Sequence, residues 1–197
     1  MKVCVDAYMH CYEVNIIIRK PLSCDLRLLL FKTFVSCHFN FCPLVWHFCT
    51  SDSILKLEKL QYRALKFVFD DYDSDYETLL NKANISTLEI SRLRLLCCEI
   101  FKIVNNLSPE YITSMFKCLK IKQINTRNVN LLEYNRYNNV NYGKKCFTNF
   151  SIHIWNNLPN VLRSQTDYAV FKKLINTWTA DSCKCNYCVS ASQRHLI

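Results

Sequence analysis

Apolar residues recur along most of this chain at steps of three and four, the spacing of one face of an α-helix. The clearest run is Ser86–Leu107, where leucine, isoleucine, valine and cysteine form one stripe and most charged residues lie off it. Ser86 and Glu89 stand three apart, as in a capping box in which a hydroxyl and a carboxylate satisfy backbone N–H groups. The pattern predicts an amphipathic helix that needs partners to bury its apolar face.

Further helices are predicted on both sides of this one. Pro21 breaks the chain, and Ser23 or Asp25 is the expected cap of a mostly buried helix over Leu26–Phe41. A start signal at Ser51–Ser53 opens a helix that runs to Val68. The remaining expected elements are an acidic turn at Asp70–Asp75, a short helix over Tyr76–Ala83, a helix opening at Ser108-Pro109-Glu110, an apolar segment over Cys146–Trp155, and a last helix from Tyr168 to Trp178 capped by Thr166 or Asp167.

After Met115 the composition changes. Seven lysine and arginine residues and a single acid, Glu133, lie between residues 117 and 150, interleaved with asparagine. We therefore predict a mainly α fold, an irregular helical bundle with a basic, Asn-rich connector and a C-terminal helix. The expected parts are a divergent N-terminal segment over 1–22, a helical bundle over 23–116, the connector over 117–150, a helical segment over 151–180 and a Cys-bearing tail over 181–197.

Glycine is nearly absent, and this excludes several classes of site. Gly143 is the one glycine among 197 residues, whereas phosphate-binding loops and dinucleotide folds need several for close backbone approach. The formal net charge of +9 favours an anionic partner, and a solvated basic surface without a specific partner is the alternative. The sequence shows no Ser/His/Asp or Cys/His nucleophile set and predicts no small-molecule substrate.

Thirteen cysteines are scattered through helix-like segments. Their number is odd and no signal peptide precedes them, so we expect reduced thiols in an intracellular compartment, nucleus or cytoplasm. The longest apolar stretch, Phe34–Cys49, is interrupted by histidine, asparagine and proline, and no membrane span is expected.

Two short patterns suggest metal chemistry. Phe69-Asp70-Asp71 looks like the aspartate pair of polymerases, but Val68 stands where an aromatic residue belongs and the segment ends a helix, so a solvated turn is the better interpretation. In the tail, three thiols and a histidine have the residue types of a tetrahedral zinc site, and a reduced tail without metal is the alternative. The four zinc-ligand candidates are Cys183, Cys185, Cys188 and His195.

Several segments, taken in order, resemble the C-terminal part of reverse transcriptases from non-LTR (LINE-type, jockey-like) retrotransposons. They cover most of the chain from Leu28 to Cys188. The resemblant segments are LLLFKTFVSCHFNFCPLVW at 28–46, LEKLQYRALKF at 57–67, SDYETLLNKA at 74–83, RLRLLCCEIFKIVNNLSP at 92–109, Thr126-Arg127, YGKK at 142–145, IWNNLP at 154–159, FKKLINTW at 171–178 and the closing CKCNYC.

The resemblance implies a thumb-like bundle from the region after the polymerase palm, which helps to hold an RNA or RNA/DNA template–primer. It places the catalytic aspartates before Leu26, so the chain alone is expected not to polymerise. Arg92 and Arg94 lie about 200° apart around a helix, so they cannot reach one groove equally. The implied phosphate contacts are Lys59, Arg63, Arg92, Arg94, Arg127, Lys144 and Lys145. The alternative is a non-catalytic helical remnant or interaction module without nucleic-acid function.

Overall fold

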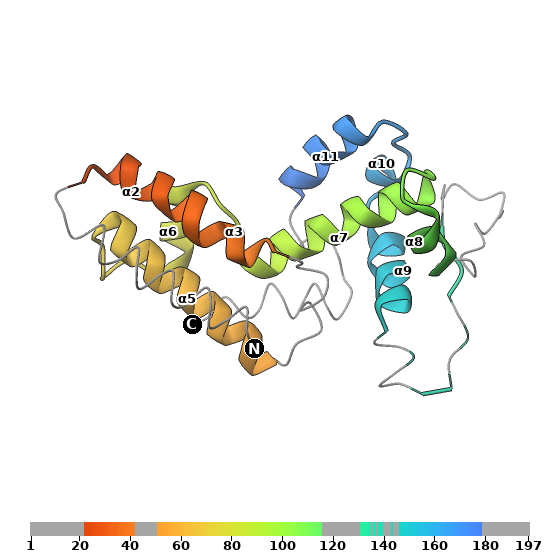
Figure 1. The fold of residues 1–197 in the computed structure, drawn as a ribbon, viewed down its shortest axis with the longest axis horizontal. Coiled ribbons are helices and arrows are strands. Elements are labelled where there is room, and N and C mark those ends of the chain that lie inside the picture. The colour runs from red at the N-terminus through yellow and green to blue at the C-terminus, as the bar shows by residue number, and fades with distance from the viewer. Residues whose placement is uncertain are drawn as a thin grey trace. The chain divides into compact units, whose positions relative to one another are not determined.

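The regular elements of the described residues are all helices, as the mainly α prediction requires (Figure 1). They divide into two compact units whose boundary lies between Arg92 and Leu93, inside one helix. The structure is a computed structural model that describes residues 22–41, 51–115, 131–134, 136, 138–139, 143 and 146–178.

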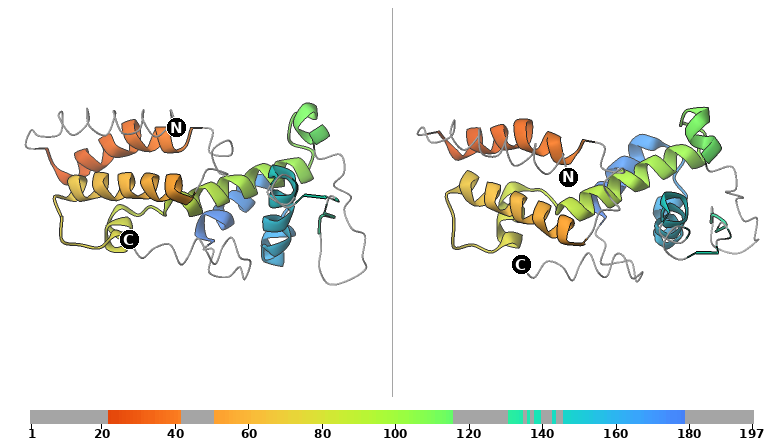
Figure 2. Two further views of the ribbon diagram at one scale, coloured as in Figure 1. Left: turned by 90° about the horizontal axis from the view of Figure 1, so that it is seen from below. Right: turned by 60° about the horizontal axis from the view of Figure 1, so that its bottom comes forward.

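Among the described residues, the first unit contains three helical segments and the first turn of α7 (Leu88–Val104). The first runs through α2 (Cys24–Leu30), the π-helical turn η1 (Phe31–Val35) and α3 (Ser36–Phe39). The second, α5 (Ser51–Phe69), lies alongside α2 in both views of Figure 2. The third, α6 (Tyr76–Ala83), has the bounds that the sequence predicts.

The helix expected over 26–41 is less buried than its composition suggests. Ser23 caps it, since its Oγ accepts the Leu26 N–H at 3.4 Å. No residue of α2 is buried, and Leu29 is 56% exposed. Burial is confined to Phe31, Val35 and Phe39, because only one side of this segment packs on the core.

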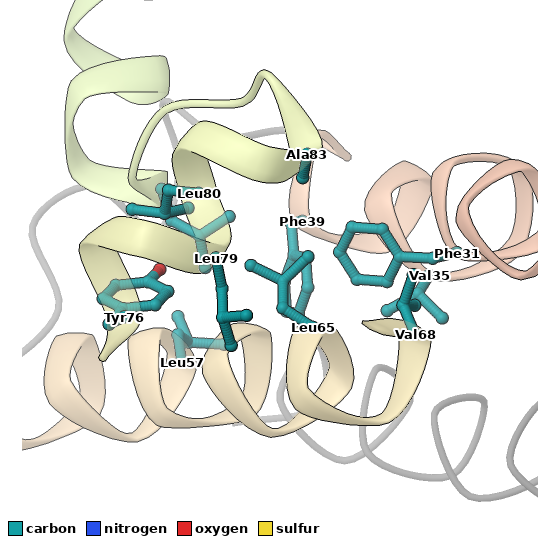
Figure 3. Packing of buried hydrophobic residues seen from close by; sticks show 11 residues of the cluster. Phe31, Val35, Phe39, Leu57, Leu65, Val68, Tyr76, Leu79, Leu80 and Ala83 are labelled. Atoms are coloured by element: carbon teal, nitrogen blue, oxygen red, sulfur yellow. The ribbon is translucent and has the colours of Figure 1, made fainter. Parts of the chain in front are cut away.

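The core of the first unit lies between these three segments (Figure 3). Leu65 and Val68 of α5 lie near the side chains of the first segment, and Leu57 lies below α6. Each such side chain contributes about 1.5–3 kcal/mol by leaving water. The buried cluster comprises Phe31, Val35, Phe39, Leu57, Leu65, Val68, Tyr76, Leu79, Leu80, Ala83 and Leu88.

The helix α7 spans Leu88–Val104, a little shorter than the predicted Ser86–Leu107. Thr87, rather than Ser86, occupies the cap position, and its Oγ1 accepts the Ile90 N–H at 3.3 Å. A second cap comes from α5, where the buried Glu58 carboxylate accepts the N–H of Leu88 at 3.4 Å and of Glu89 at 3.0 Å. The backbone N–H groups at the start of α7 therefore find acceptors both in its own cap residue and in a residue thirty positions away.

The second unit continues from Leu93. Its further helices are α8 (Glu110–Met115), α9 (Phe147–Asn157), α10 (Asn160–Arg163) and α11 (Tyr168–Thr177). Asp167, one of the two predicted caps of α11, accepts the N–H groups of Ala169 and Val170.

An aromatic stack lies at the core of the second unit. The Phe101 and Phe171 rings stack at a centroid distance of 4.4 Å, and Trp155 lies 6.2 Å from Phe171. All three side chains are almost completely buried. Residues from α7, α9 and α11 thus meet in one core.

Three helices end without glycine. Asp70, Asn84 and Asn106 take the left-handed conformation, with φ of 52°, 51° and 55°. The next residue in each case donates its N–H to the carbonyl five positions back, which is the bond of a Schellman cap. These bonds run from Asp71 to Lys66 at 3.0 Å, from Ile85 to Leu80 at 3.1 Å and from Leu107 to Lys102 at 2.7 Å.

Candidate nucleic-acid interface

The best candidate surface for an anionic partner lies on α5. Lys56, Lys59 and Arg63 are exposed there, at positions i, i+3 and i+7. At 100° per residue these side chains fall within an arc of about 60° and extend about 10 Å along the axis. We call these three residues the α5 basic face. Among the residues that the structure describes, none of the three forms an ion pair.

The rest of the helix fixes the direction of this face. Leu57 and Leu65 lie in the core, 2% and 0% exposed, and Glu58 is buried among polar partners. Because the apolar stripe is held by packing, the cationic stripe must point to solvent. The packing and cap contacts of α5 therefore position the three charges as a set.

The next cation along α5 is used differently. Lys66 Nζ donates to the Tyr72 carbonyl at 2.9 Å and lies 4.4 Å from the centre of the Tyr62 ring. Tyr62 in turn donates its hydroxyl to the Ser74 carbonyl at 2.9 Å. These contacts fasten the turn after α5, so Lys66 is not counted in the α5 basic face.

The acidic turn follows directly from the end of α5. Asp71 accepts the backbone N–H of Ser74 at 3.0 Å, the Ser74 hydroxyl at 2.7 Å and Lys82 Nζ at 2.5 Å. Hydrogen bonding to Lys82 and Ser74 holds the pKa of the Asp71 carboxyl well below its usual range. The described elements on either side are the helices α5 and α6, and Asp71 is committed to the turn that joins them.

Two of the implied phosphate contacts are directed into the protein. Arg92 is 2% exposed, so its guanidinium is not presented on the surface. Arg94 donates from Nε at 3.0 Å and from Nη2 at 2.8 Å to the Trp178 carbonyl at the end of α11. Burial lowers the pKa of Arg94. We therefore leave both arginines out of the interface.

The phosphate contacts that the resemblance implies thus fall into exposed, internally bonded and undescribed residues. Lys59 and Arg63 lie together on α5, and Lys56 joins them although the resemblance did not single it out. Its signal in the sequence is the i, i+3, i+7 spacing with the other two. Arg127, Lys144 and Lys145, and the zinc candidates Cys183, Cys185, Cys188 and His195, lie outside the described residues and stay predictions.

Parts of the basic connector are described, and asparagines of α9 hold them. Asn156 Oδ1 accepts the Leu132 N–H at 2.9 Å, and Asn156 Nδ2 donates to the Leu132 carbonyl at 2.8 Å. Asn149 Nδ2 donates to the Gly143 carbonyl at 2.8 Å. The two asparagines are seven residues apart, so they lie on the same side of α9.

Within the described ranges no three His, Cys, Asp or Glu side chains gather closely enough to hold a metal ion. The same residues include no helix long and apolar enough to cross a bilayer. Comparison with models of protein families, with curated proteins and with solved structures finds no match to this chain.

Proposed function

We propose that this chain binds the sugar–phosphate backbone of RNA or of an RNA/DNA template–primer without sequence specificity, and that it derives from the post-palm region of a non-LTR reverse transcriptase. The α5 basic face carries the proposal, because it combines three exposed cations on one arc of a packed helix. The net charge of +9 supports it by favouring approach to a polyanion. The ordered resemblance described above supports the origin.

The dimensions of the α5 basic face suit a phosphate backbone. One strand of a DNA duplex carries a charge about every 3.4 Å along its axis, and with this spacing as a guide an extent of about 10 Å is on the scale of three phosphate intervals. Each neutralised phosphate releases a counterion, which makes the affinity fall with salt. Three contacts predict a log–log slope of about −3 for a duplex, and cations outside the described residues would make it steeper.

A salt titration of binding tests this function. We expect the double variant K59A/R63A to bind a duplex more weakly than the wild type and to have a slope shallower by about 2. The matched control is K172A/K173A, which removes the same charge from exposed positions of α11 and should leave the slope unchanged. Equal slopes for all three proteins, or no binding at all, would contradict the proposal and favour a helical module without nucleic-acid function.

We place no polymerase activity in this chain alone. The resemblance assigns the catalytic aspartates to a part of the enzyme before Leu26. The hydrogen bonds of Asp71 to Ser74 and Lys82 give it a structural role in a turn. Primer extension by the purified protein should therefore not exceed that of a heat-inactivated control, and incorporation above that level would overturn this part of the proposal.

A further inference from the structure

The connector exposes an aromatic side chain, Tyr134, close to a backbone segment that is hydrogen-bonded to α9. Leu132 is 3% exposed and paired through both backbone groups to Asn156, so the chain entering Tyr134 is anchored to α9. Tyr134 itself is 48% exposed. Its hydroxyl lies 3.3 Å from His153 Nδ1, and the two rings lie 6.5 Å apart. An exposed ring held at one end loses little conformational freedom when a flat partner stacks on it.

A cation follows this ring closely in the sequence. Arg136 is exposed and stands two residues after Tyr134. An aromatic surface beside a guanidinium is the combination that proteins use for single strands, because every base has a stacking face and every nucleotide carries a phosphate. The α5 basic face lacks this combination, since no large apolar side chain described on α5 is exposed.

We propose that Tyr134 and Arg136 form a subsite for an unpaired nucleotide of RNA or single-stranded DNA. The base stacks on Tyr134, and Arg136 neutralises the adjoining phosphate. Asn156 is a positioning residue that fixes the start of this segment on α9. This inference rests on the proposed nucleic-acid binding and adds to it a ligand class that the α5 basic face does not select.

A fluorescent base gives a direct test of stacking. A single-stranded oligonucleotide containing 2-aminopurine is titrated with protein, because stacking on an aromatic ring quenches this base. We expect Y134L to abolish the quenching and to weaken single-strand binding at least about fivefold. Y134F keeps the ring and should keep the quenching. Y111L is the matched control, since Tyr111 of α8 is 70% exposed and lies outside the subsite.

Duplex binding separates this subsite from the α5 basic face. A blunt hairpin offers few unpaired bases, so Y134L should change the affinity for it less than about twofold, whereas K59A/R63A should weaken that affinity.

On the single strand, R136A should reduce the salt slope by about 0.7, the value for one phosphate. K173A, which removes another exposed charge, should leave that slope unchanged.

Each inference can fail by itself. The subsite is wrong, while the α5 basic face stands, if Y134L and Y111L quench 2-aminopurine and bind the single strand alike. The same holds if Y134L lowers the affinity for the duplex as much as the affinity for the single strand. If the wild type binds neither ligand, the proposed function fails and the subsite with it. Circular dichroism of each variant checks that the helices remain. If a variant has lost helicity, N156A takes its place. N156A should reduce the quenching of 2-aminopurine in the single strand and leave the affinity for the hairpin unchanged. Equal losses of affinity for the two ligands would show that Asn156 is not a positioning residue for the subsite.

Discussion

The hydroxyl of Tyr76 on α6 donates to the Glu58 carboxylate on α5 at 2.6 Å, and both side chains are buried. The same carboxylate accepts the backbone N–H groups of Leu88 and Glu89 in the first turn of α7. A negative charge at this end of a helix is favourable, because unpaired N–H groups and the helix dipole point toward it. One side chain therefore ties α5 to α6 and to the beginning of α7.

Removing that carboxylate should destabilise the fold strongly. Glu58→Ala leaves the Tyr76 hydroxyl and two helix N–H groups without their acceptor in a buried place. We expect the free energy of unfolding in urea to fall by about 3 kcal/mol. Glu133→Ala, at an exposed position outside the helices, is the control and should change it by less than about 0.5 kcal/mol. Similar losses for the two variants would contradict the capping role of Glu58.

Stability should decrease in alkali, and Tyr76 should be one cause. Burial, with the negative charge of Glu58 adding to it, raises the pKa of Tyr76 far above its ordinary value. The folded protein keeps this proton while the unfolded chain loses it near pH 10. The resulting stability is complete below pH 10 and falls above it, by about 1.4 kcal/mol per pH unit for one proton.

Urea unfolding between pH 9 and 11.5 measures this dependence. The free energy of unfolding of Tyr76→Phe should decline less steeply with pH than that of the wild type. The variant lacks the hydroxyl that keeps its proton in the folded chain and loses it in the unfolded chain. Tyr72→Phe is the control, since Tyr72 is 59% exposed. Its decline should match that of the wild type. Parallel curves for all three proteins would show that Tyr76 titrates alike in the folded and unfolded chains.

Arg94 should matter for stability and not for nucleic-acid binding. Its two donor atoms both reach the Trp178 carbonyl, which lies just after α11. Arg94→Ala should lower the free energy of unfolding by about 1–2 kcal/mol, because a charged donor to that carbonyl is lost. The salt slope of duplex binding should remain that of the wild type. A slope shallower by about 1 would instead identify Arg94 as a phosphate contact.

Asn84 offers a route to a more stable protein. It ends α6 with a φ of 51°, a conformation that glycine adopts without steric cost. Asn84→Gly should raise the free energy of unfolding by about 0.5 kcal/mol, and Asn84→Val should lower it by about 1–2 kcal/mol. Asn81→Gly, inside the same helix, should act in the opposite direction and lower it by about 0.3 kcal/mol. A loss at Asn84→Gly would show that the asparagine side chain itself stabilises the cap.

Elements with strong local signals were predicted well. The helix Tyr76–Ala83 has its predicted bounds, and Asp167 caps α11 as one of the two expected residues. Apolar spacing and capping side chains act over a few residues, so a sequence window contains them. The turn of α10 and the π-helical turn at Phe31–Val35 were not predicted, because neither has a distinctive local pattern.

The sequence did not distinguish basic residues that remain exposed from those that become buried or structural. Lys59 and Arg63 are exposed as a surface contact requires, whereas Arg92 is buried and Arg94 binds a backbone carbonyl. All four are basic residues on amphipathic helices, so their local patterns are alike. Their difference depends on which other segments pack against each side of the helix, and that information is spread over the chain.

The order of residues alone was enough to predict the helical class, most helix positions, the turn at Asp70–Asp75 and the excess of positive charge. Tertiary structure decided which cations reach solvent and which polar groups become structural, as Glu58 does at the start of α7. The physical reason is that helix periodicity is a local property, whereas burial and hydrogen-bond partners depend on residues far apart in the chain, such as Arg94 and Trp178.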